Sequence, residues 1–434
     1  MPKLIRLLLI LGLITIASIT LEAEASSPII DVLHAEGVIN PVLVDYIERG
    51  INQAEEDNAV ACIIQIDTPG GLDASMRDIV KDIVDARVPV VVYVSPSGAR
   101  AASAGVFITM AAHVAAMAPN TAIGAAHPVS IGSEGEETMS ETMAEKVVND
   151  AAAYIRSIAE AHGRNIEWAE KAVRESVSAT EQEALELNVI DMIAPDLNTL
   201  VSQLDGRQVT MLGGSIITLH TQGATLNHID MNTMEDFLYA ITDPNIAYIL
   251  LSLATLGIMA EIFNPGLIFP GVIGGICGLL AFYSLGVLPV NYAGILLVVL
   301  AFGLFIAEAF TASFGLFTAG GIVSLIIGSL ILFKGGPLFQ VNPWLITTVV
   351  IIIAGFFAFI ISRIIRTHRR QAATGREELI GKTAVVKVAL EPEGTVFFKG
   401  ERWRAISEEG RVEPGETVII TKIDGLKLYV FKKK

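Results

Sequence analysis

A serine in a run of small residues is the first candidate for chemistry. Ser103 stands near the end of the segment 95–105, which follows the β-branched apolar run 88–94. The small-residue segment 101–112 leads out of it. This order predicts a strand, a tight turn and a helix, with the hydroxyl at the helix N-terminus, where free N–H groups and the dipole favour negative charge. Ser103 is therefore a candidate nucleophile, and the alternative is a helix start that packs closely against a neighbour.

A pair of glycines supplies candidate donors for an oxyanion. Gly70 and Gly71 follow the apolar run 61–66, which predicts a strand. Adjacent glycines at the carboxyl end of a strand leave backbone N–H groups free to point at a ligand oxygen. The Ser103 stretch comes one βα unit later, and neighbouring parallel strands end at one crevice. We therefore predict that the N–H groups of Gly71 and Ala104 face an oxygen bonded through Ser103, although such a glycine turn alone is more often only a turn.

A serine nucleophile needs a base, and the sequence offers two kinds. His127 lies on a loop after a predicted strand, where it lines the site or serves the loop itself. A lysine that burial keeps neutral is the other kind. Lys146 lies on a long helix predicted over residues 140–161, and it acts as the base if buried or pairs with Asp150 at i+4 if exposed. Arg156, on the same helix, stays protonated and cannot serve as a base.

Strands and helices alternate through residues 26–232, and they must position these groups. Uninterrupted apolar runs between amphipathic helices are typical of a buried, mainly parallel sheet. The predicted strands are residues 29–32, 61–66, 90–94, 114–117 and 189–193, and the run 215–219 predicts an extra strand that closes the domain. The acidic segment 132–137 precedes the long helix. It is either a flap over a site or a plain solvated loop.

Five apolar runs of membrane length fill residues 246–366. They cover about 246–263, 267–288, 293–312, 316–333 and 344–365, and the first two form either two spans or a re-entrant pair. Glu261 and Glu308 lie within or near these runs. Acids inside a membrane are functional candidates, but we favour a position near a span end that water reaches. Recurrent glycines suit close helix packing in lipid: Gly271, Gly274, Gly275 and Gly278.

The chain start and the end of the last apolar run predict the topology. Two basic residues, an apolar stretch and a small-x-small site before Ser26 predict a signal peptide over residues 1–25, with an uncleaved anchor helix as the alternative. A basic cluster after the last run places the exit on the cytoplasmic side: Arg363, Arg366, Arg369 and Arg370. We therefore predict a multi-pass protein of the cell (inner) membrane, with the α/β domain outside the cytoplasm and the C-terminal domain inside.

Residues 376–434 predict a small all-β module. Five short alternating runs are separated by glycine turns, which suits an OB-like barrel. The runs are residues 383–388, 395–398, 402–406, 417–421 and 428–431. The formal net charge of -16 argues against a nucleic-acid partner. The only two cysteines, Cys62 and Cys277, lie in apolar runs and indicate neither a disulfide framework nor a zinc cluster, so no metal or cofactor is expected.

The motifs together resemble those of the NfeD family in its long form. They are Asp67-Thr-Pro-Gly-Gly71, Ala-Ala-Ser103-Ala-Gly, Ala-Tyr-Ile-Arg-Ser-Ile-Ala-Glu160 and Gly163-Arg-Asn165. The resemblance covers nearly the whole chain after the signal segment. It implies a ClpP-like (crotonase-type) α/β serine protease domain, a polytopic α-helical membrane domain and a C-terminal OB-fold.

The resemblance also implies an activity. It implies a membrane-bound endopeptidase with a Ser/Lys dyad, whose partner and substrate is a stomatin-like membrane protein cut in a hydrophobic C-terminal segment. The family nucleophile carries onto Ser103, and the oxyanion glycines onto Gly70 and Gly71. The lysine departs from the pattern, because aligning the archaeal protease form places it at Arg156. Lys146 lies ten residues earlier, about 15 Å along the helix and about 80° around it, so either Lys146 is the base or the domain is catalytically weakened.

Three functions stay open from the sequence. The leading one is the membrane serine peptidase with Ser103, Lys146 and an oxyanion hole, needing no cofactor. The rival is a scaffold that binds a stomatin- or flotillin-type partner through its spans and barrel. Crotonase-type acyl-CoA chemistry is the third, which predicted export disfavours. By analogy with ClpP-like domains we expect a homo-oligomer, and the basic tail 432–434 is expected to touch anionic membrane lipid.

Overall fold

A computed structural model describes residues 27–128, 141–311, 315–334, 336–368 and 379–433 of the chain. The predicted signal peptide and the acidic segment 132–137 lie outside the described residues, as do Arg369 and Arg370 of the basic cluster. The chain forms two compact units. One comprises Met1–Ile306 and Ala319–Val350, and the other comprises Ala307–Thr318 and Ile351–Lys434.

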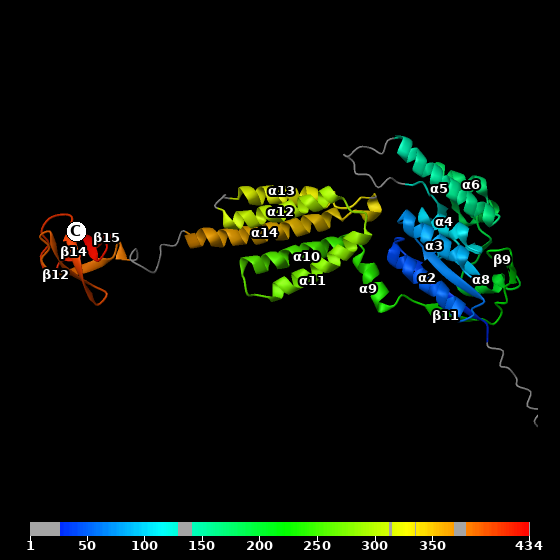
Figure 1. Cartoon of the computed structure of the whole chain (residues 1–434), viewed down its shortest axis with the longest axis horizontal. Helices are drawn as coiled ribbons and strands as arrows, with labels where there is room; N and C mark the ends of the chain where they lie inside the picture. Colours follow the sequence, from blue (N-terminus) through cyan, green and yellow to red (C-terminus); the bar gives the residue numbers. More distant parts are fainter. Residues whose placement is uncertain (1–26, 129–140, 312–314, 335, 369–378, 434) are drawn as a thin grey trace, which may run out of the picture. The chain divides into compact units, whose positions relative to one another are not determined.

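A six-stranded sheet in the order β11-β1-β2-β3-β5-β8 is the centre of the N-terminal α/β part (Figure 1). Its neighbouring strands pair in parallel throughout. The strands are β1 (Ile29–Glu36), β2 (Ala61–Asp67), β3 (Val90–Val94), β5 (Val114–Met117), β8 (Met192–Ile193) and β11 (Thr225–Ile229). The strands β3 and β5 are buried along their whole length, because helices and strands cover both faces of the sheet, and this explains their uninterrupted apolar runs. The predicted parallel sheet is confirmed, although β8 is shorter than predicted because the Val189 and Ile190 N–H groups form a turn to the Ala184 carbonyl.

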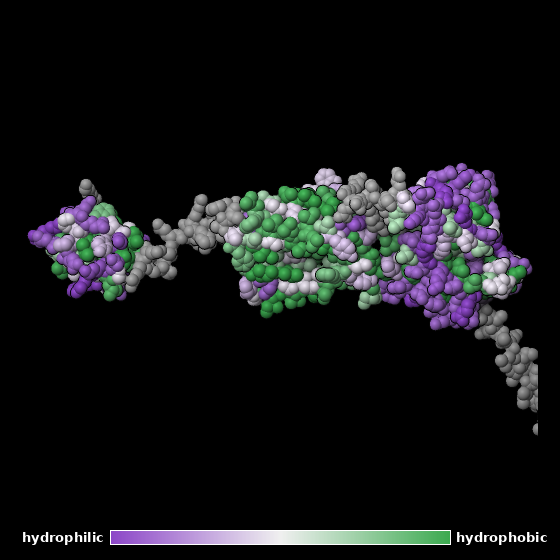
Figure 2. Space-filling model, turned by 45° about the horizontal axis from the view of Figure 1, so that its top comes forward, coloured by the Kyte–Doolittle hydropathy of each residue, from purple (hydrophilic) through white to green (hydrophobic). Residues whose placement is uncertain are grey.

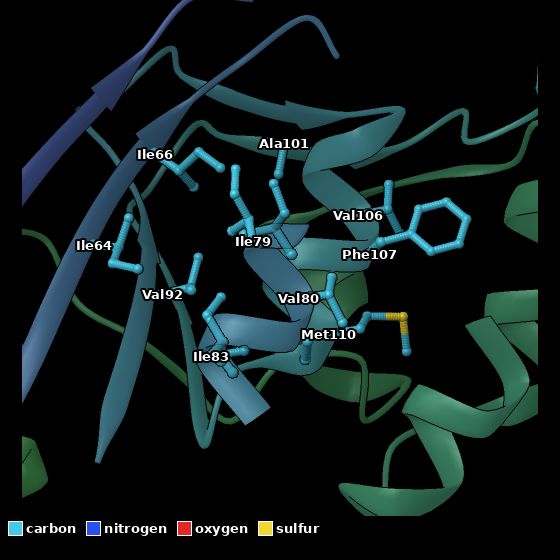
Figure 3. Packing of buried hydrophobic residues seen from close by; sticks show 14 of the residues in the cluster. Ile64, Ile66, Ile79, Val80, Ile83, Val92, Ala101, Val106, Phe107 and Met110 are labelled. Carbon is cyan, nitrogen blue, oxygen red and sulfur yellow. The ribbon is translucent and has the colours of Figure 1, made fainter. Parts of the chain in front are cut away.

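Three helices cover one face of this sheet: α2 (Pro41–Glu56), α3 (Asp73–Asp85) and α4 (Ala104–Ala111). Figure 3 shows α3 between the sheet and α4. On the sheet side it meets Ile64, Ile66 and Val92, and its own Ile79, Val80 and Ile83 lie opposite Val106, Phe107 and Met110 of α4. Each such side chain contributes about 1.5–3 kcal/mol when fully buried. The packing fixes where α4, and therefore its first residue, lies.

Helices α5 (Glu141–Ala161) and α6 (Ile166–Arg174) pack against each other and against this core. The predicted helix over residues 140–161 is therefore confirmed. Its buried residues are Ala151, Ala152, Ile155, Ile158 and Ala159. The opposite face of the sheet packs against α8 (Leu197–Leu204) and the hairpin of β9 (Gln208–Thr210) and β10 (Ile216–Thr218). The strand β10 is the extra strand that the run 215–219 predicts.

Short α9 (Thr233–Ile241) leads into five apolar helices: α10 (Pro244–Phe263), α11 (Phe269–Val287), α12 (Tyr292–Phe310), α13 (Leu316–Leu330) and α14 (Pro343–His368). Figure 2 shows hydrophobic residues over this region and hydrophilic residues over the α/β part. Among the described residues, α10 and α11 are long and apolar enough to cross a membrane, and three shorter apolar stretches follow, Tyr292–Glu308, Leu316–Leu330 and Pro343–Phe359. The number of crossings stays a prediction.

Close packing of α10 and α11 depends on one glycine pair. A Cβ on Gly257 would lie 2.8 Å from the Gly274 Cα, and a Cβ on Gly274 would lie 2.8 Å from the Ile258 nitrogen. Gly275, by contrast, has open space around its Cα. Of the glycines expected at helix contacts, Gly274 is therefore the one that brings the two backbones together, as small residues do in membrane helices.

The C-terminal strands form a closed barrel in the order β12-β13-β14-β16-β15. They are β12 (Thr383–Val388), β13 (Glu393–Phe398), β14 (Glu401–Ser407), β15 (Thr417–Asp424) and β16 (Lys427–Lys432). The pair β14 and β16 is parallel and the others are antiparallel. Alternate residues fill the interior, among them Val386, Val396 and Val430. The predicted five-stranded barrel is confirmed.

Candidate active site

Ser103 lies at the start of α4, but the route to it differs from the predicted strand, turn and helix. After β3 the chain turns and forms a short second strand, β4 (Arg100–Ala102), before Ser103. This strand pairs with β6 (Ala122–Gly124), which pairs with β7 (Ser178–Thr180). The Ser103 N–H donates to the Gly124 carbonyl at 3.3 Å. The small sheet therefore holds Ser103 in place through β6 and β7, which lie later in the chain and which no sequence pattern links to this residue.

The backbone of Ser103 adopts a conformation that L-residues avoid, with φ 52° and ψ -111°. Such strain costs about 1–3 kcal/mol and is concentrated at functional sites. Ser103 occupies the N-cap position of α4, yet its side chain makes no capping hydrogen bond. Serine hydroxyls usually cap helices from this position, so the Ser103 hydroxyl is not used in the structural role that is common there.

Gly70 lies directly against Ser103. Its φ is +116°, and a Cβ at this position would lie 2.6 Å from the Ser103 Cβ and 3.1 Å from its Oγ. Both facts require glycine. Thr68, which is fully buried, fixes the turn because its Oγ1 accepts the Gly70 N–H at 3.0 Å. Thr68 stands inside the motif Asp67-Thr-Pro-Gly-Gly71 but was not among the predicted site residues, and its signal is the common Ser/Thr turn at position i of such a segment.

The two predicted oxyanion donors are unused within the protein. In the part of the chain that the structure describes, neither the Gly71 nor the Ala104 N–H has a hydrogen-bond acceptor. Ala104 is the first residue of α4, whose N–H groups have no partner inside the helix. The two segments also touch, since the Ala102 N–H donates to the Thr68 carbonyl at 3.0 Å. The structure thus brings the glycine turn and the serine together, as the order of the strands predicts.

Lys146 is not brought to this point. Its side chain is exposed, and it makes no hydrogen bond or ion pair with Ser103 among the described residues. The predicted alternative, a pair with Asp150, is wrong, because Asp150 accepts from Arg77 of α3 at 2.5 Å. Arg77 also lies over the Tyr154 ring, 4.5 Å from its centroid, and these contacts tie α5 to α3.

The other two candidates for a base are engaged elsewhere. The Arg156 guanidinium pairs with Glu170 of α6 at 3.2 Å. The His127 Nδ1 lies 2.7 Å from the Val173 carbonyl oxygen. Both residues therefore join α5 or the loop after β6 to α6, and neither reaches the serine.

Arg164, inside the Gly163-Arg-Asn165 motif, supports the helix that carries the serine. Its guanidinium is buried and donates to the carbonyls of Met110, Ala112 and Val189 at 3.0–3.2 Å, and it pairs with Asp191 at 2.9 Å. The first two carbonyls lie at the end of α4, where carbonyls lack helical partners. Burial lowers the pKa of Arg164 below its usual value, and the ion pair with Asp191 offsets part of that shift. The motif is thus a cap for α4.

The two acids of the membrane region, Glu261 and Glu308, accept hydrogen bonds from backbone N–H groups near the ends of helices. The Glu261 Oε1 accepts the Gly266 N–H at 3.1 Å. The Glu308 carboxylate is buried, and it accepts the N–H groups of Gly315 at 2.8 Å and Thr318 at 3.0 Å at the start of α13. A carboxylate at a helix N-terminus is stabilising. Burial of Glu308 differs from the water-accessible position that the sequence analysis favoured.

Three domain families match the chain. NfeD1b, N-terminal domain, matches residues 30–200, the NfeD integral membrane domain matches residues 245–363, and the NfeD-like C-terminal, partner-binding domain matches residues 376–432. The membrane-bound protease PH1510 of Pyrococcus horikoshii is 39% identical over 415 residues, which is 94% of each chain. The membrane protein NfeD1b of Bacillus subtilis is 27% identical over 450 residues, which is 96% of each chain.

Solved structures of parts of the Pyrococcus protease are similar to parts of this chain. Its 1510-N domain, described as a stomatin-specific protease and solved as a lysine-to-alanine mutant with a substrate peptide, is 35% identical and covers 50% of this chain and 99% of that chain, with a TM-score of 0.47. A serine-to-alanine mutant has also been solved, with 35% identity, coverage of 48% and 100%, and a TM-score of 0.45. The 1510-C domain of the stomatin operon partner protein is 42% identical and covers 14% and 97%, with a TM-score of 0.14.

Fold and comparisons define a class: a membrane-bound protein with an α/β domain built on a parallel sheet, a helical integral membrane domain and a C-terminal five-stranded barrel. It is homologous to a membrane-bound protease along nearly its whole length. The chain belongs to the NfeD family.

Proposed function

We propose that the protein is a membrane-bound serine endopeptidase in which Ser103 is the nucleophile. The Ser103 Oγ attacks the peptide carbonyl, and its proton passes to the base, Lys146. The N–H groups of Gly71 and Ala104 stabilise the oxyanion, with Gly70 shaping the turn. The lysine then gives the proton to the leaving amine, and water hydrolyses the acyl-enzyme by the same steps.

The observation that carries the proposal is the contact between Gly70 and Ser103. A strained serine with an uncapped hydroxyl lies against a glycine turn, and a free N–H is available on each side. A nucleophile with an oxyanion hole requires this combination, whereas a helix start that only packs closely requires no strain at the serine.

The sequence spacing in the Pyrococcus relative favours Lys146 over Arg156 as the base. In that protease the serine and the lysine replaced by alanine are 41 residues apart. In this chain 43 residues separate Ser103 from Lys146, and 53 separate Ser103 from Arg156. The offset from the relative's spacing is thus two residues for Lys146 and twelve for Arg156.

Lys146 can act as a base only when it is neutral, and burial favours the neutral form. It is exposed in the single chain, as are its neighbours Met143 and Val147, which are 49% and 39% exposed. A bound peptide or a second copy of the chain that covers these two side chains would also desolvate the amine. The proposal therefore includes a homo-oligomer or a substrate-completed site.

The substrate is proposed from the relatives. The Pyrococcus domain is described as specific for a stomatin homologue, and we extend this to a hydrophobic segment of a stomatin-like membrane protein. A signal peptide over residues 1–25 directs the protease domain out of the cytoplasm, and the C-terminal barrel lies inside the cytoplasm. The OB-type domain over residues 376–434 binds a stomatin- or flotillin-like partner.

A second function is favoured by the exposure of Lys146 and by the partner-binding description of the C-terminal family. If no cover ever brings Lys146 to Ser103, the chain is a scaffold that holds a stomatin-like protein without cutting it. The two functions differ in the reactivity of one hydroxyl.

The test uses the full chain in lipid nanodiscs with a fluorophosphonate probe and a stomatin homologue. We expect Ser103 to be labelled and the homologue to be cut, and both to be lost in Ser103→Ala. The control Ser157→Ala changes an exposed serine on α5 and should keep both. Cleavage that survives in Ser103→Ala would disprove the mechanism. Binding of the homologue with neither labelling nor cleavage would establish the scaffold.

A further inference from the structure

Residues 37–40, which join β1 to α2, run beside the glycine turn. The Ile39 N–H donates to the Gly70 carbonyl at 2.9 Å, and the Leu72 N–H donates to the Ile39 carbonyl at 2.9 Å. Ile39 and Gly71 thus form an isolated parallel bridge. A Cβ on Gly71 would overlap the Ile39 backbone. The glycine turn is therefore in close backbone contact with residues 37–40 on one side and with Ser103 on the other.

Residues 37–40 are in turn held by α9. The Tyr239 hydroxyl donates its one proton in a bifurcated hydrogen bond, with the Glu36 carbonyl oxygen at 2.9 Å and the Val38 carbonyl oxygen at 3.2 Å. A Cβ on Gly37, whose φ is +95°, would lie 2.5 Å from the Tyr239 Oη, so glycine is needed for the phenol to reach these carbonyls. Burial raises the pKa of Tyr239 to about 12, and the phenol, which is protonated at neutral pH even without this shift, stays a donor.

A second side-chain bond joins the same two segments. The Asn40 Nδ2 donates to the Thr242 Oγ1 at 2.9 Å, and both residues are buried. Asn40 also caps α2, because its Oδ1 accepts the Leu43 N–H. The end of α9 is thus fixed to the start of α2, immediately after the segment that carries the glycine turn.

Membrane helices hold α9. The Ser284 Oγ of α11, fully buried, donates to the Ile241 carbonyl at 2.6 Å. Val38 and Leu72 pack against an apolar cluster that includes Tyr248, Leu288 and Phe339, and a cavity of about 270 Å³ remains between these groups. All these residues belong to the same compact unit. A continuous set of contacts therefore leads from α11 through α9 and residues 37–40 to Gly70 and Gly71.

We propose that Tyr239 is a positioning residue for the oxyanion hole, and that through it the membrane domain controls peptide cleavage. Oxyanion donors lower the barrier only when they are fixed before charge develops. Gly70 and Gly71 have no side chains, so beyond the Thr68 hydroxyl their position depends on residues 37–40 and, through them, on α9. The catalytic role of Tyr239 rests on the proposed function, whereas the contacts that lead from α11 to the glycine turn are independent of it.

The experiment measures peptide cleavage and amide hydrogen exchange in the full chain in nanodiscs. Tyr239→Phe removes the hydroxyl alone, and we expect kcat for a hydrophobic peptide to fall about tenfold with KM nearly unchanged, as for loss of an interaction made in the transition state. Ser284→Ala leaves Tyr239 in place and loosens α9, so a smaller fall in kcat is expected. The control Tyr292→Phe changes a tyrosine that is 76% exposed and should keep wild-type kinetics.

Amide hydrogen exchange of the segment 70–72 is the readout that needs no activity. We expect faster exchange in Tyr239→Phe than in wild type and in Tyr292→Phe. Unchanged exchange together with unchanged kcat would overturn the inference. Faster exchange in a chain whose wild type neither cleaves nor reacts with fluorophosphonate would refute the proposed function alone. A fall in kcat with a matching rise in KM and unchanged exchange would place Tyr239 in substrate binding and also overturn the inference.

Discussion

The serine side and the lysine side of the candidate site differ in how the protein holds them. Ser103 is fixed by backbone contacts to Gly70 and Gly124, and its helix is capped by buried Arg164. Lys146 lies in the first turns of α5, where its neighbours are exposed and it makes no hydrogen bond to the serine among the described residues. The proposed oxyanion donors are thus held in place within the single chain, whereas the proposed base is exposed and depends on what covers it.

The contrast also exists within α5 itself. From Ala151 onward one stripe of the helix is buried against the core, and before it the side chains are mostly exposed. Arg77 and Tyr154 join the middle of the helix to α3. A helix anchored by its second half can present its first half to a ligand, so the exposure of Lys146 is compatible with a base that becomes buried on binding.

The largest expected effect concerns the base. Lys146→Ala should lower kcat by about 10²–10⁴, the usual contribution of a general base. Lys146→Arg should not restore it, because arginine stays protonated. Arg156→Ala, which removes only the pair with Glu170, is the matched control and should stay within about twofold. Steady-state cleavage of a hydrophobic peptide measures all three, and activity that follows Arg156 instead would reverse the assignment.

The next effect is on the serine side. Arg164→Met removes a buried guanidinium that bonds three carbonyls and leaves Asp191 with one cationic partner fewer. Breaking such a buried pair costs about 3–5 kcal/mol. We expect that loss in the free energy of unfolding of the N-terminal domain by urea. Arg156→Met, at a half-exposed pair, should change it by about 0–1 kcal/mol, and equal losses in both variants would contradict the assigned role of Arg164.

Local signals made much of the serine side predictable. Apolar runs in the sequence indicate the buried strands, and Gly70 and Ser103 stand in small-residue segments at strand ends. The strand β4 was missed because its partners β6 and β7 come later in the chain, and three-residue strands have no periodicity to detect. Arg164 was noted only as part of a motif, because backbone carbonyls of α4 are its partners and carbonyls have no sequence signature.

The lysine side was predictable only as a choice between burial and exposure. The helix was placed correctly, since residues 140–161 lack glycine and proline in their interior. The partner of Asp150 was not, because Arg77 lies far away in sequence and reaches it only through the packing of α3 against α5. Whether a surface lysine is desolvated depends on a second molecule, which no pattern within the chain records.

A third prediction probes the contact between the glycine turn and the serine. Gly70→Ala must accommodate both a φ of +116° and a Cβ that would lie 2.6 Å from the Ser103 Cβ. We expect a loss of about 2–4 kcal/mol from strain and overpacking, together with loss of fluorophosphonate labelling. The matched control is Gly163→Ala, where φ is +64° and nothing lies near the new Cβ. It should cost about 1–2 kcal/mol and keep labelling, and labelling that survives in Gly70→Ala would remove this glycine from the site.

The smallest expected effect is a pH dependence next to the serine helix. Burial, with His162 nearby, lowers the pKa of His113 from 6.5 to about 4. His113 is therefore neutral in the folded protein between these values, while the unfolded chain takes up a proton. Its contribution to stability is fully present above pH 6.5 and is lost as the pH falls toward 4, by about 3–4 kcal/mol in all. Urea unfolding at several pH values gives the free energy of unfolding as a function of pH. This free energy should change less steeply with pH in His113→Gln than in wild type, whatever the absolute stability of the variant. Since the His113 Nδ1 accepts the Val90 N–H, glutamine keeps an acceptor there, and equal slopes in both proteins would show that the end of α4 opens to water in the native state.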